Sequence, residues 1–218
     1  MRVVHLCFHG IGSPSREREP GEARYWVDDE LFLRTLDEVA GRADVRLSFD
    51  DGNRSDVEVA LPALRERGLR ARFFALAGRL DDPLSLGADD LRLLVSAGME
   101  VGSHGWAHVS LRGLDDRGAR RELQNARRTI EEAAGCRVTE LALPLGQYDR
   151  ELLGRLRDAG YDRVFTSDRR PARENTWLQP RYSITSTDTI ASVRRILSAR
   201  RSVQSTRSAL VGAAKRLR

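Results

Sequence analysis

The chain has 218 residues, of which 40% are apolar and 32% are charged. This length supplies one domain with a sizeable hydrophobic core and is short for two. The apolar runs hold only a few residues each, whereas a membrane span needs roughly 20 and the core of a signal peptide roughly 7 to 15. We therefore expect a single globular domain with neither a membrane crossing nor an export signal.

The net charge of +5 is concentrated at the C-terminus. Residues 191–218 carry eight basic residues and no acid, so residues 1–190 carry 5 − 8 = −3. The charge therefore indicates no nucleic-acid partner for the main domain. We predict a main domain over 1–190 and a basic C-terminal helix or tail over 191–218. The tail is either a solvated end or an amphipathic segment that contacts anionic lipid.

Two cysteines, Cys7 and Cys136, are too few for a disulfide framework. Each lies in or beside an apolar run, where a free thiol behaves as a small hydrophobic group. We therefore predict a reducing compartment, the cytoplasm, with association at a membrane surface if the tail binds lipid.

A helical segment that ends in glycine and is followed by a short β-like run occurs four times, at Gly68, Gly98, Gly135 and Gly160. We predict strands over residues 3–8, 45–49, 72–75, 99–103, 137–138, 139–143, 163–165 and 182–185. Helices are predicted from a capping box at 55–58, over 115–134 and over about 189–201. Alternation of strands and helices predicts an α/β fold, an irregular (β/α) barrel of about seven strands with its chemistry at the carboxyl ends of the strands.

Two pairs of polar residues follow predicted strands. Asp50 and Asp51 directly follow the strand 45–49, where adjacent side chains point in different directions. One carboxylate can therefore bind a metal while the other reaches the water bound to that metal. His104 and His108 follow the strand 99–103, and a spacing of four places both on one face of a helical turn, where they can share a divalent ion. The two pairs together are more specific than either alone.

Over most of residues 3–185 the sequence resembles the polysaccharide deacetylases of carbohydrate esterase family 4. The segment 48–52, Ser-Phe-Asp-Asp-Gly, resembles the first motif of that family, 102–108 resembles the second, and 141–146 resembles the third. The resemblance implies that Asp50 is the catalytic base and that Asp51, His104 and His108 hold the metal.

The resemblance also implies a substrate groove and a cofactor. The backbone N–H of Leu145 would stabilise the oxyanion, and Pro144 would form part of the groove wall. Tyr148 and Trp106 are candidates for stacking on a sugar ring, and each is equally explained by packing or as part of the groove wall. The implied cofactor is a divalent metal, Zn²⁺ in our prediction, although a His₂Asp site also accepts Co²⁺, Ni²⁺ or Mn²⁺.

The sequence departs from the family at two positions. Ala142 stands where many members carry an arginine that orients the catalytic aspartate, and Arg181 is either its substitute at Asp50 or a surface residue. No histidine follows His108, although members usually carry a late histidine as general acid. Either Asp50 returns the proton itself, or His9 or an acid such as Asp188 replaces that histidine, or catalysis is weak. Our interpretation of His9 is a supporting residue beside the site.

We therefore expect a metal-dependent hydrolase that removes an N-acetyl group from an amino sugar in a glycan or glycan precursor, such as a glycolipid intermediate. Two alternatives stay open at this point. One is a non-catalytic glycan- or metal-binding protein of the same fold, which the missing late histidine favours and the retained aspartates and histidines oppose. The other is a hydrolase of a different amide.

Overall fold

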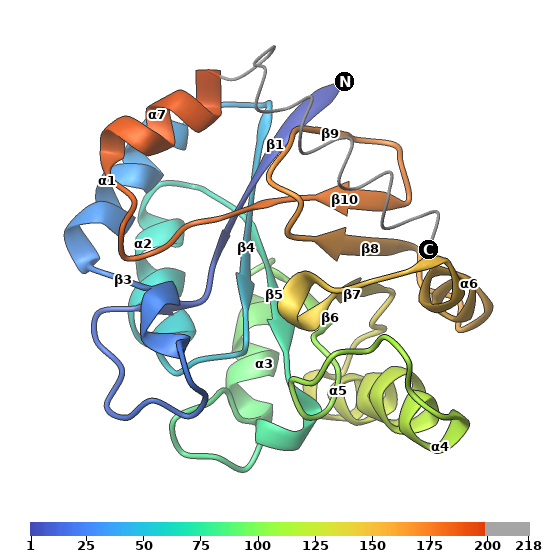
Figure 1. Ribbon diagram of the computed structural model, residues 1–218. Coiled ribbons are helices and arrows are strands. Elements are labelled where there is room, and N and C mark those ends of the chain that lie inside the picture. Colours follow the sequence, from blue (N-terminus) through green and yellow to red (C-terminus); the bar gives the residue numbers. More distant parts are fainter. Residues whose placement is uncertain (199–218) are drawn as a thin grey trace.

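Eight parallel strands form the centre of the molecule, in the spatial order β10, β8, β7, β6, β5, β4, β1 and β11 (Figure 1). The computed structural model describes residues 1–198. The strands are β1 (Arg2–Phe8), β4 (Val45–Asp50), β5 (Ala71–Ala75), β6 (Glu100–Ser103), β7 (Glu140–Ala142), β8 (Arg163–Thr166), β10 (Leu178–Pro180) and β11 (Tyr182–Ser183). In addition, β9 (Ala172–Arg173) pairs antiparallel with β1, and β2 (Gly10–Ile11) pairs with β3 (Trp26–Val27).

A single residue links the two edge strands of the sheet, so that the barrel is nearly closed. β10 and β11 lie at opposite ends of the strand order, yet only Arg181 separates them in the chain. The chain therefore crosses from one edge of the sheet to the other at Arg181, which brings the two edges together. The predicted irregular (β/α) barrel is confirmed, with eight parallel strands rather than about seven.

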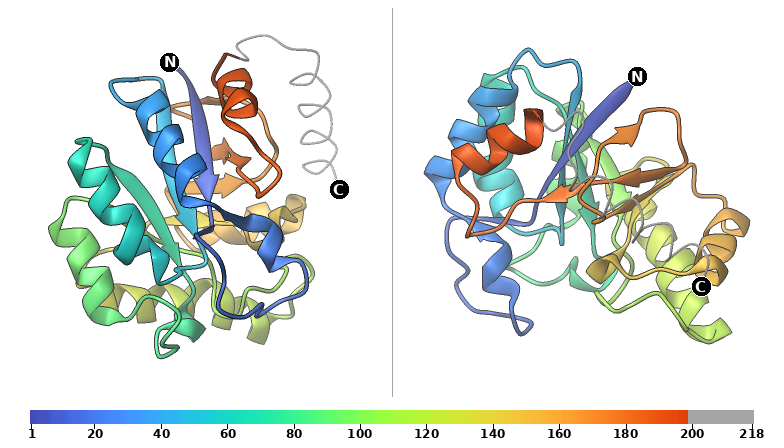
Figure 2. Two further views of the ribbon diagram at one scale, coloured as in Figure 1. Left: turned by 90° about the vertical axis from the view of Figure 1, so that its left-hand side faces the viewer. Right: turned by 45° about the horizontal axis from the view of Figure 1, so that its top comes forward.

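Helices cover the outer face of the sheet, as the two views of Figure 2 show. They are α1 (Asp29–Val39), α2 (Leu61–Glu66), α3 (Ala88–Ser96), α4 (Asp116–Ala119), α5 (Ala126–Ala134), α6 (Arg150–Asp158) and α7 (Ile190–Ser198). Shorter or wider turns are η1 (Glu22–Tyr25), η2 (Asp56–Ala60), η3 (Ala77–Arg79), η4 (Arg120–Asn125) and η5 (Pro144–Gly146). All four glycines predicted to end helices have a positive φ, which places them in the left-handed region.

Apolar side chains cover both faces of the strands, as expected for a parallel sheet. The rings of Phe49 and Phe73 stack with centroids 4.7 Å apart within the main hydrophobic cluster. A separate small cluster contains Phe74, Ala142 and Phe165. Burying one such phenylalanine side chain stabilises the fold by about 1.5–3 kcal/mol.

Two local predictions are wrong. Residues 137–138 are not a strand, because the chain after α5 enters the sheet only at Glu140. Ser55 is not the start of a capping box: its backbone is already helical, with φ −58°, and its hydroxyl accepts a hydrogen bond from the N–H of Ile11 at 3.2 Å. A tertiary contact thus uses the hydroxyl that a cap would need.

The terminal helix predicted over about 189–201 is described as far as Ser198. It packs against α1, with Val193, Ile196 and Leu197 buried in the main hydrophobic cluster. The rest of the predicted basic segment, 199–218, lies outside the described residues. Within residues 1–198, none of the helices combines the length and the apolar character that a membrane crossing requires.

Candidate metal and catalytic centre

The predicted site residues meet at the carboxyl ends of the strands. Asp50 is the last residue of β4 and Asp51 follows it, while His104 directly follows β6. Arg181 directly follows β10, and His9 directly follows β1. Because all these strands are parallel, their carboxyl ends lie at one end of the barrel, as expected from the sequence.

Unusual backbone conformations gather at these positions. Four non-glycine residues among those described have a positive φ, and three of them are Asp51 (76°), His108 (54°) and Leu145 (58°). Left-handed backbone costs an L-residue roughly 1–2 kcal/mol, so the surrounding structure must impose it. Such outliers cluster at functional sites.

The prediction that His104 and His108 share a helical turn is wrong, although the two rings do meet. Residues 104–108 form a loop, and Gly105 has a φ of 85°. The ring centroids lie 5.3 Å apart. A Cβ at Gly105 would lie 2.9 Å from the carboxylate of Glu122, so the loop needs glycine there for space as well as for conformation.

The three predicted metal ligands converge on one point. The Nε2 atoms of His104 and His108 each lie 3.4 Å from Oδ1 of Asp51. Two ligands bound about 2.1 Å from a tetrahedral zinc ion are themselves about 3.4 Å apart, so these separations match such an ion. Asp51 Oδ1 is buried and has no hydrogen-bond partner in the described part of the chain. The donor set and the orphaned oxygen both fit a divalent metal.

The charges at the site keep Asp51 available as a ligand. Burial raises the pKa of Asp51, but the neighbouring histidines, His104 first among them, lower it by more, so the net pKa is below its usual range. Burial lowers the pKa of His104, and the carboxylates of Asp50 and Asp51 more than offset this. A carboxylate that remains ionised is the form a metal needs.

Contacts behind the ligands orient them. His104 Nδ1 lies 2.9 Å from the carbonyl oxygen of Ala142, which leaves Nε2 to face Asp51. The buried carboxylate of Glu122 accepts hydrogen bonds from the N–H groups of Trp106 and Ala107, at 2.6 and 3.2 Å, and thereby holds the loop between the two histidines. Glu122 is not among the residues predicted from the sequence, because nothing in a helical pattern distinguishes this acid from its solvated neighbours.

Arg181 reaches Asp50, as one of the two alternatives predicted. Its two terminal nitrogens each lie 2.7 Å from one carboxylate oxygen of Asp50, and Nη1 also donates to Ser48 at 3.1 Å. The guanidinium lies over the rings of Phe74 and Phe165, with its carbon 5.4 and 5.7 Å from their centroids. Burial raises the pKa of Asp50, but Arg181 and then His104 lower it, to about 2 in the metal-free protein. Asp50 is therefore ionised at neutral pH.

Of the candidate proton donors, His9 lies beside Asp50 and Asp188 is otherwise engaged. A ring nitrogen of His9, an oxygen of Asp50 and the sulfur of Cys7 all lie within 4.8 Å of one another, and Nδ1 of His9 has no hydrogen-bond partner among the described residues. The His9 ring packs against Tyr25, with centroids 4.7 Å apart. In contrast, the carboxylate of Asp188, in the turn before α7, accepts hydrogen bonds from Thr185 and Ser192.

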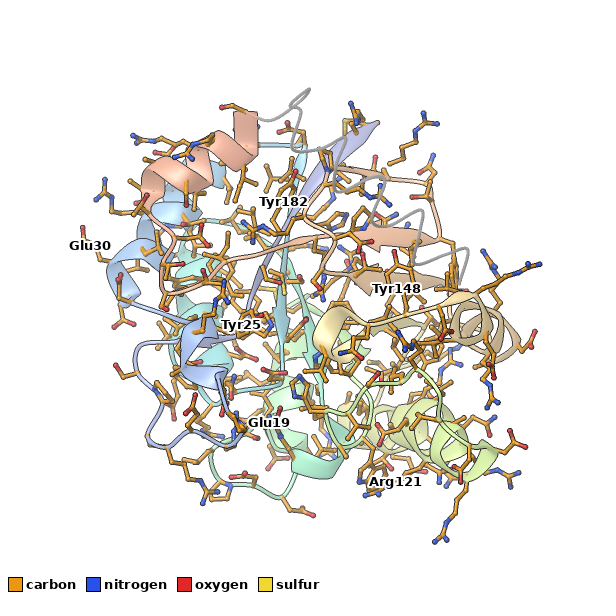
Figure 3. The ribbon with its side chains drawn as sticks, in the orientation of Figure 1. Glu19, Tyr25, Glu30, Arg121, Tyr148 and Tyr182 are labelled. Carbon is orange, nitrogen blue, oxygen red and sulfur yellow. The ribbon has the colours of Figure 1, made fainter. Side chains whose placement is uncertain are left out.

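The predicted groove residues divide into two groups. Leu145 is 56% exposed and Pro144 is buried, both in the turn after β7. The prediction of Tyr148 as a groove residue is corrected: Tyr148, labelled in Figure 3, is 2% exposed and its hydroxyl donates to Asp168 at 2.6 Å. Trp106 is half-buried against the main hydrophobic cluster, and Arg121 covers its ring at 5.3 Å. Packing therefore accounts for the positions of the Tyr148 and Trp106 rings.

Solved structures of deacetylases share this fold. The structure of the Streptococcus pyogenes deacetylase PplD in complex with acetate superimposes with a TM-score of 0.76, at 17% sequence identity, over 91% of this chain and 99% of that one. At this identity the likeness concerns the fold.

Two curated proteins of Bacillus subtilis (strain 168) also match. The polysaccharide deacetylase YxkH is 23% identical over 177 residues, which are 75% of this chain and 63% of YxkH. The peptidoglycan-N-acetylmuramic acid deacetylase PdaC is 29% identical over 114 residues, which are 52% of this chain and 24% of PdaC. The chain thus spans less than two thirds of the length of either relative.

The sequence profile of the polysaccharide deacetylase family matches residues 38–164. These residues make up more than half of the chain and contain Asp50, Asp51 and both histidines of the metal site. The resemblance seen in the short motifs thus extends across the strands that carry them, and the chain belongs to the polysaccharide deacetylase family.

Proposed function

We propose that this protein is a metal-dependent deacetylase that hydrolyses the N-acetyl group of an amino sugar in a glycan or glycan precursor. Membership of the family supports deacetylation, and the name of the relative PdaC describes an N-acetylated sugar of peptidoglycan as its substrate. The observation that carries the proposal is the pairing of a three-ligand metal site with a second aspartate that takes no part in it.

That division gives each aspartate one task. Asp51 Oδ1 lies 3.4 Å from the Nε2 atoms of His104 and His108. Both oxygens of Asp50 instead accept hydrogen bonds from Arg181, and Oδ2 stays 3.9 Å from Nε2 of His104. A Zn²⁺ ion bound by these three ligands would polarise the acetyl carbonyl and lower the pKa of the attacking water toward 7. Asp50, ionised and held in place by two hydrogen bonds, accepts the proton of that water.

The oxyanion and the leaving amine need further groups. By the family resemblance, the N–H of Leu145 stabilises the oxyanion, and the left-handed backbone at Leu145 fixes the direction of that N–H. The proton for the amine comes either from Asp50, which received it, or from His9, whose ring lies beside Asp50. The hydrogen bonds of Asp188 to Thr185 and Ser192 favour these two groups over Asp188 as the proton donor.

Zinc is our choice of metal because His₂Asp is a donor set that zinc favours. The cytoplasmic location, a glycolipid intermediate as substrate and a membrane contact of the segment 191–218 stay predictions from the sequence.

The test is acetate release by the purified chain. Protein stripped with a chelator and reloaded with Zn²⁺ is incubated with N-acetylated oligosaccharides, and free acetate is measured. We expect release that requires the metal, and a decrease in turnover of roughly 10² to 10⁴ in Asp50→Asn with the metal still bound. Asp116→Asn, at a side chain that is 93% exposed, is the matched control and should leave turnover unchanged.

Two outcomes would contradict the proposal. Saturable glycan binding without acetate release by the zinc-loaded wild type would favour the non-catalytic binding protein. Equal turnover of the wild type and Asp50→Asn would remove Asp50 from the role of base.

A further inference from the structure

The segment 12–21, between β2 and η1, is anchored beside the metal site. Arg18 forms an ion pair with Glu22 at 3.1 Å, with side chains only 10% and 8% exposed. Arg18 also donates to Ser85 at 2.8 Å and to the side chain of Asn53, which lies in the turn after β4. These contacts hold the segment against the end of the barrel at which the aspartates lie.

The residue next to this anchor contacts a metal ligand. Oε2 of Glu19 lies 2.5 Å from Nδ1 of His108, and Oε1 accepts a hydrogen bond from Arg79 at the end of η3. The Glu19 side chain is about one-third exposed, and Figure 3 shows it extending from its loop toward the middle of the molecule. Its two oxygens therefore have separate partners.

The contact between Glu19 and Nδ1 of His108 determines which ring nitrogen of His108 is available to bind a metal. A neutral imidazole carries one proton, and a carboxylate at Nδ1 keeps the proton there, so the lone pair of Nε2 faces Asp51. His104 obtains the same arrangement from the carbonyl of Ala142. Because His108 lies on a loop with left-handed backbone, its ring has no regular element to orient it, and the carboxylate supplies that orientation.

We propose that Glu19 is a positioning residue of the metal site, which holds His108 in the tautomer and orientation that bind the ion and adds negative charge behind it. The site is thereby completed by a loop outside the two motifs that supply its ligands. This inference rests on the proposed metal-dependent function. Carboxylates that orient metal-bound histidines commonly change metal affinity by 10- to 100-fold.

The experiment measures the Zn²⁺ affinity of the full chain by competition with a chromophoric chelator. We expect Glu19→Ala to weaken Zn²⁺ binding by about 10- to 100-fold. Glu19→Gln, which keeps an acceptor oxygen without the charge, should show a smaller loss in the same direction. Glu17→Gln is the matched control on the same loop: Glu17 accepts a hydrogen bond only from the backbone N–H of Ala23 among the described contacts, so its affinity should stay within twofold of the wild type.

A second variant separates positioning from tethering of the loop. Arg79→Met removes the other partner of Glu19 and leaves the contact with His108, so it should retain most of the affinity. In the zinc-loaded protein, NMR of the imidazole protons should show the Nδ1 proton of His108 in a hydrogen bond in the wild type and without that hydrogen bond in Glu19→Ala.

The outcomes distinguish this inference from the proposed function. Equal Zn²⁺ affinity of Glu19→Ala and the wild type, or an equal loss in Arg79→Met, would overturn the role of Glu19 alone. A wild-type chain that binds no Zn²⁺ would overturn the proposed metal-dependent function together with it.

Discussion

Replacement of Arg181 by methionine tests the electrostatic centre of the site. Arg181 and Asp50 have side chains 2% and 4% exposed, and two hydrogen bonds of 2.7 Å join them. Methionine keeps much of the apolar volume that lies over Phe74 and Phe165, but it leaves Asp50 buried without its cation. Loss of one partner from a buried ion pair typically costs about 3–5 kcal/mol of unfolding free energy.

The destabilisation caused by Arg181→Met must depend on pH, and the pKa of Asp50 determines the direction of that dependence. The pKa of Asp50 is about 2 in the folded protein and 3.8 ordinarily, so its ionisation stabilises the fold above pH 4 and this contribution is lost as the pH falls toward 2. The difference between these two pKa values corresponds to roughly 2 kcal/mol of unfolding free energy, of which about 1 kcal/mol is lost between pH 7 and pH 3. In Arg181→Met the pKa of Asp50 rises, so the difference between the wild type and the variant should shrink over that interval.

The assay is urea unfolding of both proteins at pH 7 and pH 3 with a chelator present, so that no metal contributes. Arg163→Met is the matched control, because the Arg163 side chain is 39% exposed and pairs with Glu140 near the surface, where an ion pair contributes up to about 1 kcal/mol. A destabilisation by Arg181→Met at pH 7 no larger than that of the control, or one of equal size at both pH values, would refute the reasoning.

Three further predictions concern the site and its surroundings. His104→Ala and His108→Ala should each lose the bound metal, as measured by elemental analysis, because two remaining ligands make too weak a site; metal retained in both would contradict the ligand assignment. His9→Gln should retain zinc and separates the two candidate proton donors: a decrease in acetate release of roughly 10² would identify His9 as the donor, whereas unchanged turnover would leave Asp50 as the donor. Asp56→Asn should be more stable than the wild type at pH 7 in urea unfolding and lose that advantage below about pH 4. Burial and then the nearby aspartates raise the pKa of Asp56 well above 3.8, and neither of its carboxylate oxygens has a hydrogen-bond partner in residues 1–198. Ionisation of Asp56 therefore opposes folding as the pH rises. An Asp56→Asn variant that is less stable than the wild type at pH 7 would disprove this.

The sequence by itself determined the fold class and the group of residues at the centre of the site. Glycine at the helix ends and short β-like runs are local signals, because they depend on the conformations available to one or a few residues. They located the principal strands, and the carboxyl ends of parallel strands must then meet. Asp50, Asp51, His104 and His108 could be brought together on that argument without any knowledge of the contacts.

Only the tertiary structure decided what surrounds these four residues. Arg181 contacts Asp50 across 131 positions in the chain and Glu19 contacts His108 across 89, and the burial of Tyr148 likewise depends on how distant elements pack. Local patterns also misassigned Ser55 and the turn at residues 104–108, where a tertiary contact or a glycine overrode the expected helix geometry. The physical reason is that a side chain's partner depends on closure of the barrel. The pattern along one segment reports which way a residue points, but not which residue from another segment it meets.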